Sequence, residues 1–254
     1  MSFHIIIPAR YDSSRLPGKP LLLIGDKPMV QHVYDRATEC GAASVVVACE
    51  DQRIADVVEA FGGKVCMTSA EHQSGTDRLA ETVELLGLPD DAVVVNLQGD
   101  EPLMPPELLH QVAELLEQNP EADMATLCTR IHTAAELFDP HAVKVISDAN
   151  GRALYFSRAV IPWDRDAFAV TTEELPEQAV HFRHLGIYAY RVGYLKRYVS
   201  LDSCQLERME SLEQLRVLWH GGAIQVAEAS SVPGHGVDTQ ADLDRVRALV
   251  ESRG

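Results

Sequence analysis

The sequence predicts an α/β fold in which helices cover both faces of a mainly parallel, twisted sheet. The first observation is a series of short, continuously apolar runs, which are typical of strands buried on both faces. The second is that stretches with helical spacing separate these runs, and such alternation is the signature of parallel βαβ units. The third is the composition, since 46% hydrophobic and 24% charged residues among 254 are ordinary for a globular chain.

The elements of the first half follow this alternation in order. Strands are expected at residues 3–7, 44–48, 92–97 and 124–128, and crossover helices at residues 28–40, 51–61, 74–86 and 106–117. Ser74 and Asp77 predict a capping box at the start of the third helix. Because ligands of such folds bind beyond the carboxyl ends of the strands, the loops after the apolar runs are the places to look for chemistry.

The pattern changes near residue 143. Strands are expected at residues 143–147, 152–157 and 184–190 without helices between them, and a turn-prone segment at 148–151 joins the first two. Helical spacing returns at residues 208–220 and 240–252. We therefore expect a single domain, residues 1–254, that carries a hairpin-bearing insertion at residues 143–190.

The charge and the cysteines exclude several classes of protein. With 22 Lys and Arg against 38 Asp and Glu, the net charge of −16 repels nucleic acid and anionic lipid. No apolar run approaches the roughly 18 residues of a membrane span, and no basic flank marks a signal peptide. Five cysteines, odd in number and without a C-x-x-C pair, argue against a disulfide framework and a thiolate zinc site. We expect a cytoplasmic protein with no nucleic-acid or membrane partner.

The loop after the first strand is basic in spite of this negative charge. Arg10, Arg15 and Lys19 stand within ten positions, and Ser13 and Ser14 lie among them. Such cations, with hydroxyls and open backbone N–H groups, suit a triphosphate; a solvated basic loop is the alternative. The segment has neither a G-x-G-x-x-G fingerprint nor a Walker loop, which disfavours a nicotinamide-dependent oxidoreductase and a P-loop kinase.

Two acidic residues are candidate ligands for a divalent cation. Asp100 follows the strand at 92–97 and comes directly after Gly99, which lets the backbone approach closely. A carboxylate there can hold a hard cation that bridges nucleotide phosphates, or it can cap the next helix. Asp238 lies in the glycine-rich segment 232–239 and is weaker on its own, because Thr239 with Asp242 would cap the last helix regardless.

Taken together, these segments resemble the sugar-activating nucleotidyltransferases, and specifically the family of 3-deoxy-manno-octulosonate (Kdo) cytidylyltransferases. The resemblance runs nearly end to end and implies the Rossmann-like fold of the nucleotide-diphospho-sugar transferases. It implies transfer of CMP from CTP to the anomeric hydroxyl of Kdo, giving CMP-Kdo and pyrophosphate for lipopolysaccharide synthesis. The segments that carry it are Ser-Arg-Leu-Pro-Gly-Lys-Pro at 14–20, His-Gln-Ser-Gly-Thr-Asp-Arg at 72–78, and residues 96–102, 155–166, 184–188, 213–219 and 232–239.

The resemblance also implies roles for individual residues and a homodimer formed through residues 143–190. Asp100 and Asp238 would bind Mg²⁺, and Lys19 and Arg15 would stabilise the departing pyrophosphate. The implied nucleotide contacts are Ala9, Arg10, Ser13, Arg15, Lys19, Gln73, Ser74, Gly75 and Arg78. The implied sugar contacts are Gln98, Arg158, His184, Tyr188, Glu213 and Gln214.

The residues alone leave alternatives open. Arg158 can be a surface cation, His184 and Tyr188 can be satisfied core residues, and a solvated helix face is the ordinary role of residues such as Glu213 and Gln214. A CMP-sialic acid synthetase is the main competing function, since it also acts on a 2-keto sugar acid. A regulatory module that binds CTP without turnover is the other.

Overall fold

The computed structural model describes residues 2–12, 15–72, 74–176, 180–234 and 236–252. Within these ranges one nine-stranded sheet has the order β11-β7-β10-β6-β1-β4-β5, with β8 and β9 joined beside β10. A separate hairpin consists of β2 (Leu23–Ile24) and β3 (Lys27–Pro28). The strands of the large sheet are β1 (Phe3–Ala9), β4 (Ser44–Cys49), β5 (Val65–Met67), β6 (Val93–Asn96), β7 (Met124–Arg130), β8 (Lys144–Ser147), β9 (Ala153–Ser157), β10 (Phe182–Arg191) and β11 (Ile224–Glu228).

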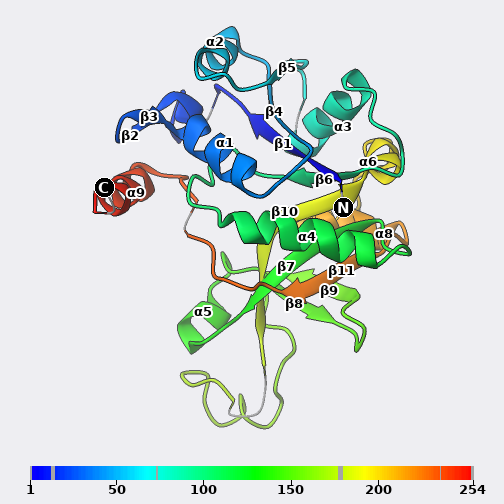
Figure 1. The fold of residues 1–254 in the computed structure, drawn as a ribbon. Helices are drawn as coiled ribbons and strands as arrows, with labels where there is room; N and C mark the ends of the chain where they lie inside the picture. The colour runs from blue at the N-terminus through cyan, green and yellow to red at the C-terminus, as the bar shows by residue number, and fades with distance from the viewer. Residues whose placement is uncertain (1, 13–14, 73, 177–179, 235, 253–254) are drawn as a thin grey trace.

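Helices pack on both faces of the sheet, as the sequence predicts (Figure 1). Strand β1 explains why, because Ile5 and Ile7 face one apolar cluster while Ile6 faces the other. None of the helices within the described residues is long and apolar enough to cross a membrane. Helices α1 (Met29–Glu39), α2 (Gln52–Ala60) and α4 (Pro106–Gln118) cover the first face, and α3 (Gly75–Leu85), α6 (Val192–Tyr198) and α8 (Gln214–Trp219) cover the second.

The parallel half of the sheet brings two loops together. Strand β1 pairs in parallel with both β4 and β6, so the carboxyl ends of β1 and β6 lie at the same edge. The basic loop follows β1, and the segment with Asp100 follows β6. The four strands and four helices expected for residues 3–128 are confirmed with boundaries that differ by one or two residues.

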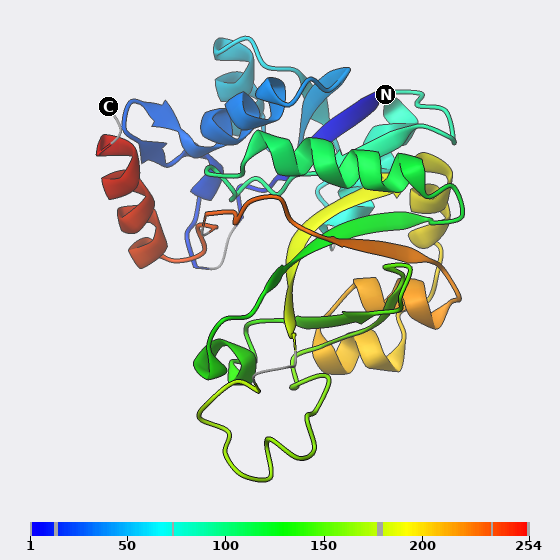
Figure 2. The same ribbon diagram turned by 60° about the horizontal axis from the view of Figure 1, so that its bottom comes forward.

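Strand β10 joins the two halves of the sheet. It runs antiparallel to β6 on one side and to β7 on the other. The expected hairpin is confirmed as the antiparallel pair β8–β9, and β8 attaches to Phe182 and Arg183 at the start of β10 (Figure 2). The end of the segment 143–190 is therefore a central strand of the main sheet. Its apolar pattern predicts a strand but carries no information on which strands it pairs with.

The single helix expected at residues 208–220 is wrong, because two short helices occupy this stretch. Helix α7 (Gln205–Glu210) ends at Ser211, whose φ of 52° is left-handed and cannot continue an α-helix. The Leu212 N–H donates to the carbonyl of Glu207 at 3.2 Å and closes the helix end. Helix α8 then starts afresh at Gln214, so that Glu213 and Gln214 stand at a helix start instead of on a continuous helix face.

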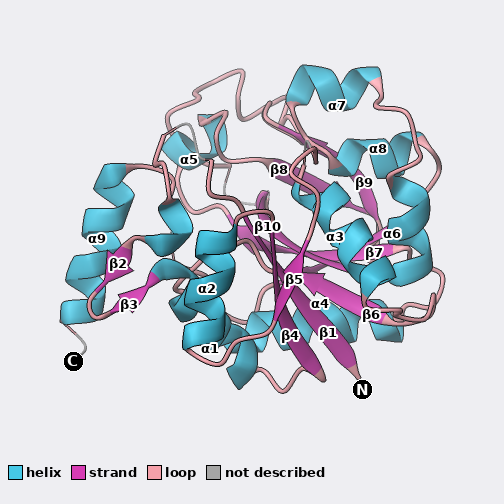
Figure 3. Ribbon diagram, turned by 90° about the horizontal axis from the view of Figure 1, so that it is seen from above, coloured by secondary structure: helices cyan, strands magenta, loops and turns pink. Residues whose placement is uncertain are grey.

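The last helix, α9 (Gln240–Glu251), packs beside the β2–β3 hairpin, apart from the helices on the large sheet (Figure 3). A small apolar cluster joins Leu16 of the basic loop, Ile24 of the hairpin and Leu243 of the helix. Val237, which is fully buried, belongs to the same cluster. This packing returns the end of the chain to the first loop, and it places Asp238 near the carboxyl edge of the sheet.

Candidate active site

Two adjoining cavities open at the carboxyl edge of the parallel strands. Gly75 and Gln98 line both of them, so the two volumes share a wall. The first, of about 330 Å³, is lined by Pro8, Ala9, Arg10, Asp12, Arg15, Lys19, Pro20, Gly75, Gln98, Gly99, Asp100 and Asp238. The second, of about 440 Å³, is lined by Gly75, Thr76, Asn96, Gln98, Met124, His141, Val143, Arg183, His184, Gly186, Tyr188, Tyr190, Tyr198, Ser211, Leu212, Glu213, Gln214 and Val217.

Lys19 joins the two candidate acidic ligands. It starts the short 3-10 helix Lys19–Leu21, and its Nζ lies 2.6 Å from Oδ2 of Asp100 and 3.3 Å from Oδ1 of Asp238. The same ammonium donates to the carbonyl of Val237 at 3.0 Å. Arg15 adds a second cation, with its guanidinium 3.3 Å from Oδ1 of Asp238. Two carboxylates that are distant in the sequence therefore face one position.

The segments that carry these carboxylates are also held together through the backbone. A Cβ on Gly99 would lie 2.8 Å from the carbonyl oxygen of Pro8, so only glycine allows this approach to the end of β1. The Val237 N–H donates to the carbonyl of Asp100 at 2.8 Å. Thr239, and not Asp238, caps α9 in a capping box with Asp242. The carboxylate of Asp238 is consequently available to the cavity.

Glu101 is a third acid beside this pair that the sequence analysis does not single out. Burial raises its pKa to about 8, and the negative charges of Asp100 and Asp238 act in the same direction. At neutral pH this side chain is therefore mostly protonated, so the cluster presents two carboxylate charges to Lys19. Its place directly after Asp100 is the one signal in the sequence that points to it.

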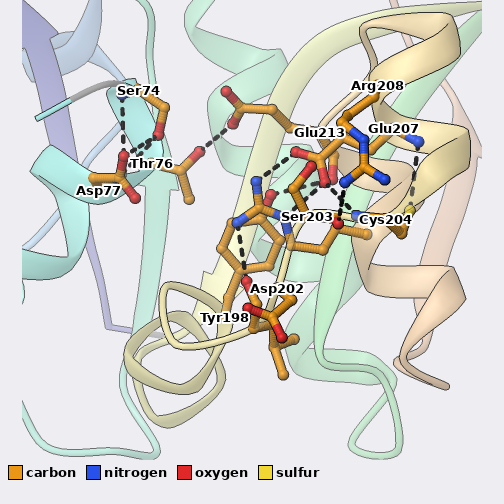
Figure 4. A network of polar contacts seen from close by, with 12 residues as sticks. Ser74, Thr76, Asp77, Tyr198, Asp202, Ser203, Cys204, Glu207, Arg208 and Glu213 are labelled. Atoms are coloured by element: carbon orange, nitrogen blue, oxygen red, sulfur yellow. Dashed lines mark hydrogen bonds and ion pairs between the residues drawn. The ribbon is translucent and has the colours of Figure 1, made fainter.

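The start of α3 connects the first cavity to the second. Ser74 caps the helix and forms the predicted capping box with Asp77, and the Thr76 hydroxyl donates to Oε2 of Glu213 at 2.8 Å (Figure 4). This contact links α3 to the start of α8 across the shared wall. Ser13 and Gln73, two of the implied nucleotide contacts, lie outside the described residues.

Arg78 is buried beneath the first loop. Its Nη2 lies 2.8 Å from Oε2 of Glu50, and Oε1 of Glu50 accepts a hydrogen bond from the Tyr11 N–H at 2.9 Å. Burial lowers the pKa of Arg78, and the charge of Glu50 opposes this effect. The Nε of Arg78 is buried and has no partner among the described residues. Arg78 thus holds the basic loop through Glu50 and keeps one buried donor.

The second cavity collects most of the residues implied as sugar contacts. Gln98, His184, Tyr188, Glu213 and Gln214 all line it. A solvated helix face is the wrong description of Gln214, which is 4% exposed and whose Nε2 lacks a partner within the described part of the chain. Burial lowers the pKa of His184 to about 3 and raises that of Tyr188, so both side chains are neutral at physiological pH. The cavity offers mainly uncharged hydrogen-bonding groups, which suit hydroxyls.

Comparison with known proteins assigns the chain. Residues 4–226 match the profile of the family described as Cytidylyltransferase. This chain belongs to the cytidylyltransferase family. It is 59% identical over 249 residues to a 3-deoxy-manno-octulosonate cytidylyltransferase of Hahella chejuensis, covering 98% of each chain. It is 56% identical over 252 residues to the protein of the same name in Thioalkalivibrio sulfidiphilus, covering 99% of this chain and 100% of that one.

A solved structure supports the fold of this cytidylyltransferase. A CMP:2-keto-3-deoxy-manno-octonic acid synthetase, determined in complex with CTP, superposes with a TM-score of 0.91 at 45% identity. The match covers 100% of both chains. The nucleotidyltransferase fold predicted from the sequence is therefore confirmed.

Arg158 is the implied sugar contact that does not line the second cavity of the cytidylyltransferase. Its Nε donates to the carbonyl of Glu210 at 2.6 Å and its Nη1 to the carbonyl of Pro140 at 3.0 Å. These carbonyls directly precede His141 and Ser211, which do line the cavity. The contacts place Arg158 behind the cavity wall, and its binding of a sugar carboxylate stays a prediction.

Three further residues in the cavity wall are not among the contacts expected from the sequence. Arg183 lines the cavity and lies 3.0 Å from Oε1 of Glu136, and His141 and Ser211 line it from two loops. Arg183 directly precedes the strand expected at 184–190, and a charged residue at that position is a signal that could have identified it. His141 and Ser211 have no comparable signal, because loop residues of these types are common on any surface.

Proposed function

We propose that this cytidylyltransferase transfers CMP from CTP to the anomeric hydroxyl of Kdo, releasing pyrophosphate and supplying CMP-Kdo for lipopolysaccharide synthesis. The observation that carries the proposal is the pair of adjoining cavities. One is lined by cations and carboxylates suited to a nucleotide triphosphate, and the other mainly by uncharged hydrogen-bonding groups, with Arg183 and Glu213 among them, suited to a sugar acid. The names of the relatives in Hahella and Thioalkalivibrio support the same assignment.

The side chains of the first cavity account for the charge that develops in this reaction. The anomeric oxygen attacks the α-phosphorus in line, the bond to pyrophosphate breaks, and negative charge grows on the phosphoryl oxygens and the leaving group. Lys19 and Arg15, which pair with carboxylates, can donate to these oxygens instead. Cations held in place before the reaction stabilise this charge without reorganising.

We propose Asp100 and Asp238 as the protein ligands of Mg²⁺. Their oxygens both contact the ammonium of Lys19, so the two carboxylates already converge on a cation. Among the described residues no group of three His, Cys, Asp or Glu side chains completes a cage. A pair of carboxylates suits Mg²⁺, which usually keeps several waters and takes oxygens from substrate phosphates. When bound, the ion neutralises phosphate charge and lowers the pKa of a nearby hydroxyl.

The sugar acid is assigned to the second cavity. Gln98, His184, Tyr188, Glu213 and Gln214 are its proposed contacts. The strongest support for a ligand oxygen there is the Nε2 of Gln214, which is buried and has no partner among the residues that the structure describes. An unpaired buried donor is costly unless a ligand or water satisfies it. A module that only binds CTP has no need of this second cavity.

Two further proposals concern the state of the protein in the cell. We propose a homodimer that uses residues 143–190, because Trp163 and Val170 in this segment are 55% and 86% exposed. Exposed apolar side chains that gather in one segment mark interaction surfaces.

We also propose a cytoplasmic location, since all five cysteines are free thiols and four of them are buried, as expected in a reducing compartment.

The proposed reaction is tested with Asp100→Asn and Asp238→Asn. Each amide keeps the shape of the side chain and removes the charge, so release of pyrophosphate from CTP with Kdo should fall at least a hundredfold at saturating Mg²⁺. Asp244→Asn, an exposed residue on α9, is the control and should retain the wild-type rate. Rates close to wild type in both site variants would refute the assignment.

A further inference from the structure

A buried hydroxyl lies next to an irregularity in β10. The register between β10 and β7 shifts between Leu185 and Tyr188, opposite Thr126 of β7. Thr126 is fully buried, and its Oγ1 lies 2.7 Å from the carbonyl oxygen of Ile187 and 3.1 Å from that of Leu185. The third group at this oxygen is the Nε2 of His184, at 2.9 Å. Thr126 does not line the sugar cavity, whereas His184 does.

The direction of each hydrogen bond follows from counting protons. A threonine hydroxyl has one proton and two lone pairs, and carbonyl oxygens only accept. The Thr126 proton therefore goes to a carbonyl, with that of Ile187 the closer, and a lone pair of Oγ1 faces Nε2 of His184. Nε2 must then carry a hydrogen. Reversing the bond to His184 would leave two carbonyl oxygens facing hydroxyl lone pairs.

The surroundings of His184 keep the ring in this arrangement. The ring packs edge-on against Phe156 with centroids 5.0 Å apart and lies 5.3 Å from the ring of Tyr188. Burial also keeps the imidazole neutral, because it lowers the pKa of His184 to about 3. A neutral imidazole has one N–H, so a hydrogen on Nε2 makes Nδ1 an acceptor.

We infer that Thr126 is a positioning residue that holds His184 in its Nε2–H tautomer, so that Nδ1 accepts a hydrogen bond from a hydroxyl of the sugar acid. This inference rests on the proposed function, since it assumes that the sugar acid occupies the cavity lined by His184. The inference predicts that the cavity selects for a hydrogen-bond donor at the position that contacts His184. The group that contacts His184 must be a donor, so a substrate in which that hydroxyl is methylated is rejected.

The tautomer is tested by ¹⁵N NMR of the histidine rings in the protein without substrate. The signals of His184 are identified by their loss in His184→Gln. We expect the wild type to show a protonated Nε2 and an unprotonated Nδ1 at this ring. Thr126→Val removes the hydroxyl at constant shape and should shift both nitrogens towards a mixture of tautomers, while Thr126→Ser should preserve the wild-type pattern. A hydrogen on Nδ1 in the wild type would overturn the inference.

Kinetics provide the second measurement. Thr126→Val should raise KM for Kdo about threefold to tenfold, as expected for a weakened hydrogen bond, and leave KM for CTP unchanged. Thr126→Ser should restore the wild-type KM. Thr38→Val, which removes an exposed hydroxyl on α1 that donates to the Asp35 carbonyl, is the matched control. Equal changes in both KM values would contradict the inference.

The two readouts separate this inference from the proposed function. If Kdo is not the substrate, the kinetic effect is absent but the ring nitrogens still report an Nε2–H tautomer that depends on Thr126. If Thr126→Val does not fold, the wild-type spectrum and Thr126→Ser decide: an Nε2–H tautomer in both supports the inference. A loss of that tautomer in the serine variant opposes it.

Discussion

Arg15 and Arg158 belong to different halves of the site at the level of single side chains. Arg15 is 63% exposed at the rim of the first cavity, where it pairs with Asp238. Arg158 supports the loops of the second cavity, the proposed sugar site, through the carbonyls of Pro140 and Glu210. We expect Arg158→Ala to raise KM for Kdo by one to two orders of magnitude with little change for CTP, and Arg15→Ala to do the reverse.

Steady-state kinetics with each substrate varied in turn will check this division. Arg36→Ala on α1, which removes a local pair with Glu39, serves as the control and should leave both KM values unchanged. Equal losses for both substrates in both variants would mean that the two cavities do not act separately.

His184 gives the stability of the protein a defined dependence on pH. Its pKa is about 3 in the folded chain and near 6.5 when unfolded, so the unfolded chain binds a proton first as the pH falls. The contribution of the neutral His184 ring to the free energy of unfolding is fully present above about pH 6.5. As the pH falls from there towards 3, the free energy of unfolding decreases by up to ~1.4 kcal/mol per pH unit. Thermal melts of His184→Gln should therefore depend less steeply on pH between 6.5 and 4 than those of the wild type. His110→Gln, at an exposed position, should melt with the wild-type slope; a wild-type slope for His184→Gln would contradict the prediction.

Site residues differ in how far the sequence reveals them. Lys19 and Asp100 are predictable because each lies in a polar loop, and each of these loops follows an apolar strand. The burial of Gln214 is not, because it depends on the break at Ser211, and a left-handed serine leaves no trace in the helical spacing. Thr126 is also hidden, since a threonine is ordinary in a strand and its partners come from β10.

At the level of whole elements, Gly99 sets the distance between the acidic segment and the end of β1. In Gly99→Ala the new Cβ would meet the backbone carbonyl of Pro8, which cannot rotate away as a side chain could. We expect the segment to move outward by a few tenths of an ångström with Asp100, and kcat to fall about tenfold or more. Pyrophosphate release measures this effect. Circular dichroism and the melting temperature should report a folded protein, and an unchanged kcat would show that the close approach does not matter for the reaction.

The elements that the sequence predicts best are those with a long periodic pattern. Helices α1 to α4 bury one face each, and β1, β4, β6 and β7 each contain a largely apolar run. The three-residue β5 and the five-residue α5 (Ala134–Phe138) are too short to show a period. Strand β11 is not among the expected strands, although it lies in a largely apolar stretch at 223–227.

At the level of the whole molecule, the exposed apolar residues of the segment 143–190 predict a dimer. Sedimentation at micromolar concentration should give a species near twice the 28.0 kDa of one chain. Trp163→Asp combined with Val170→Asp should shift this species towards the monomer, because a charge is costly in an apolar interface. Leu249→Asp, at a partly exposed site on α9, is the control. An active wild-type protein that sediments as a monomer would refute the dimer.

The position of β7 in the sheet has a consequence for how the chain is made. Both neighbours of β7, the strands β10 and β11, come later in the sequence, whereas β1, β4, β5 and β6 pair only with one another until β10 arrives. During synthesis the nucleotide-binding half can therefore assemble early, while β7 leaves the ribosome with both edges unpaired. Those edges must wait for residues 182–191 and 224–228. The second cavity, which residues of β10 and α8 line, therefore forms late, and the first cavity is complete only when Asp238 follows.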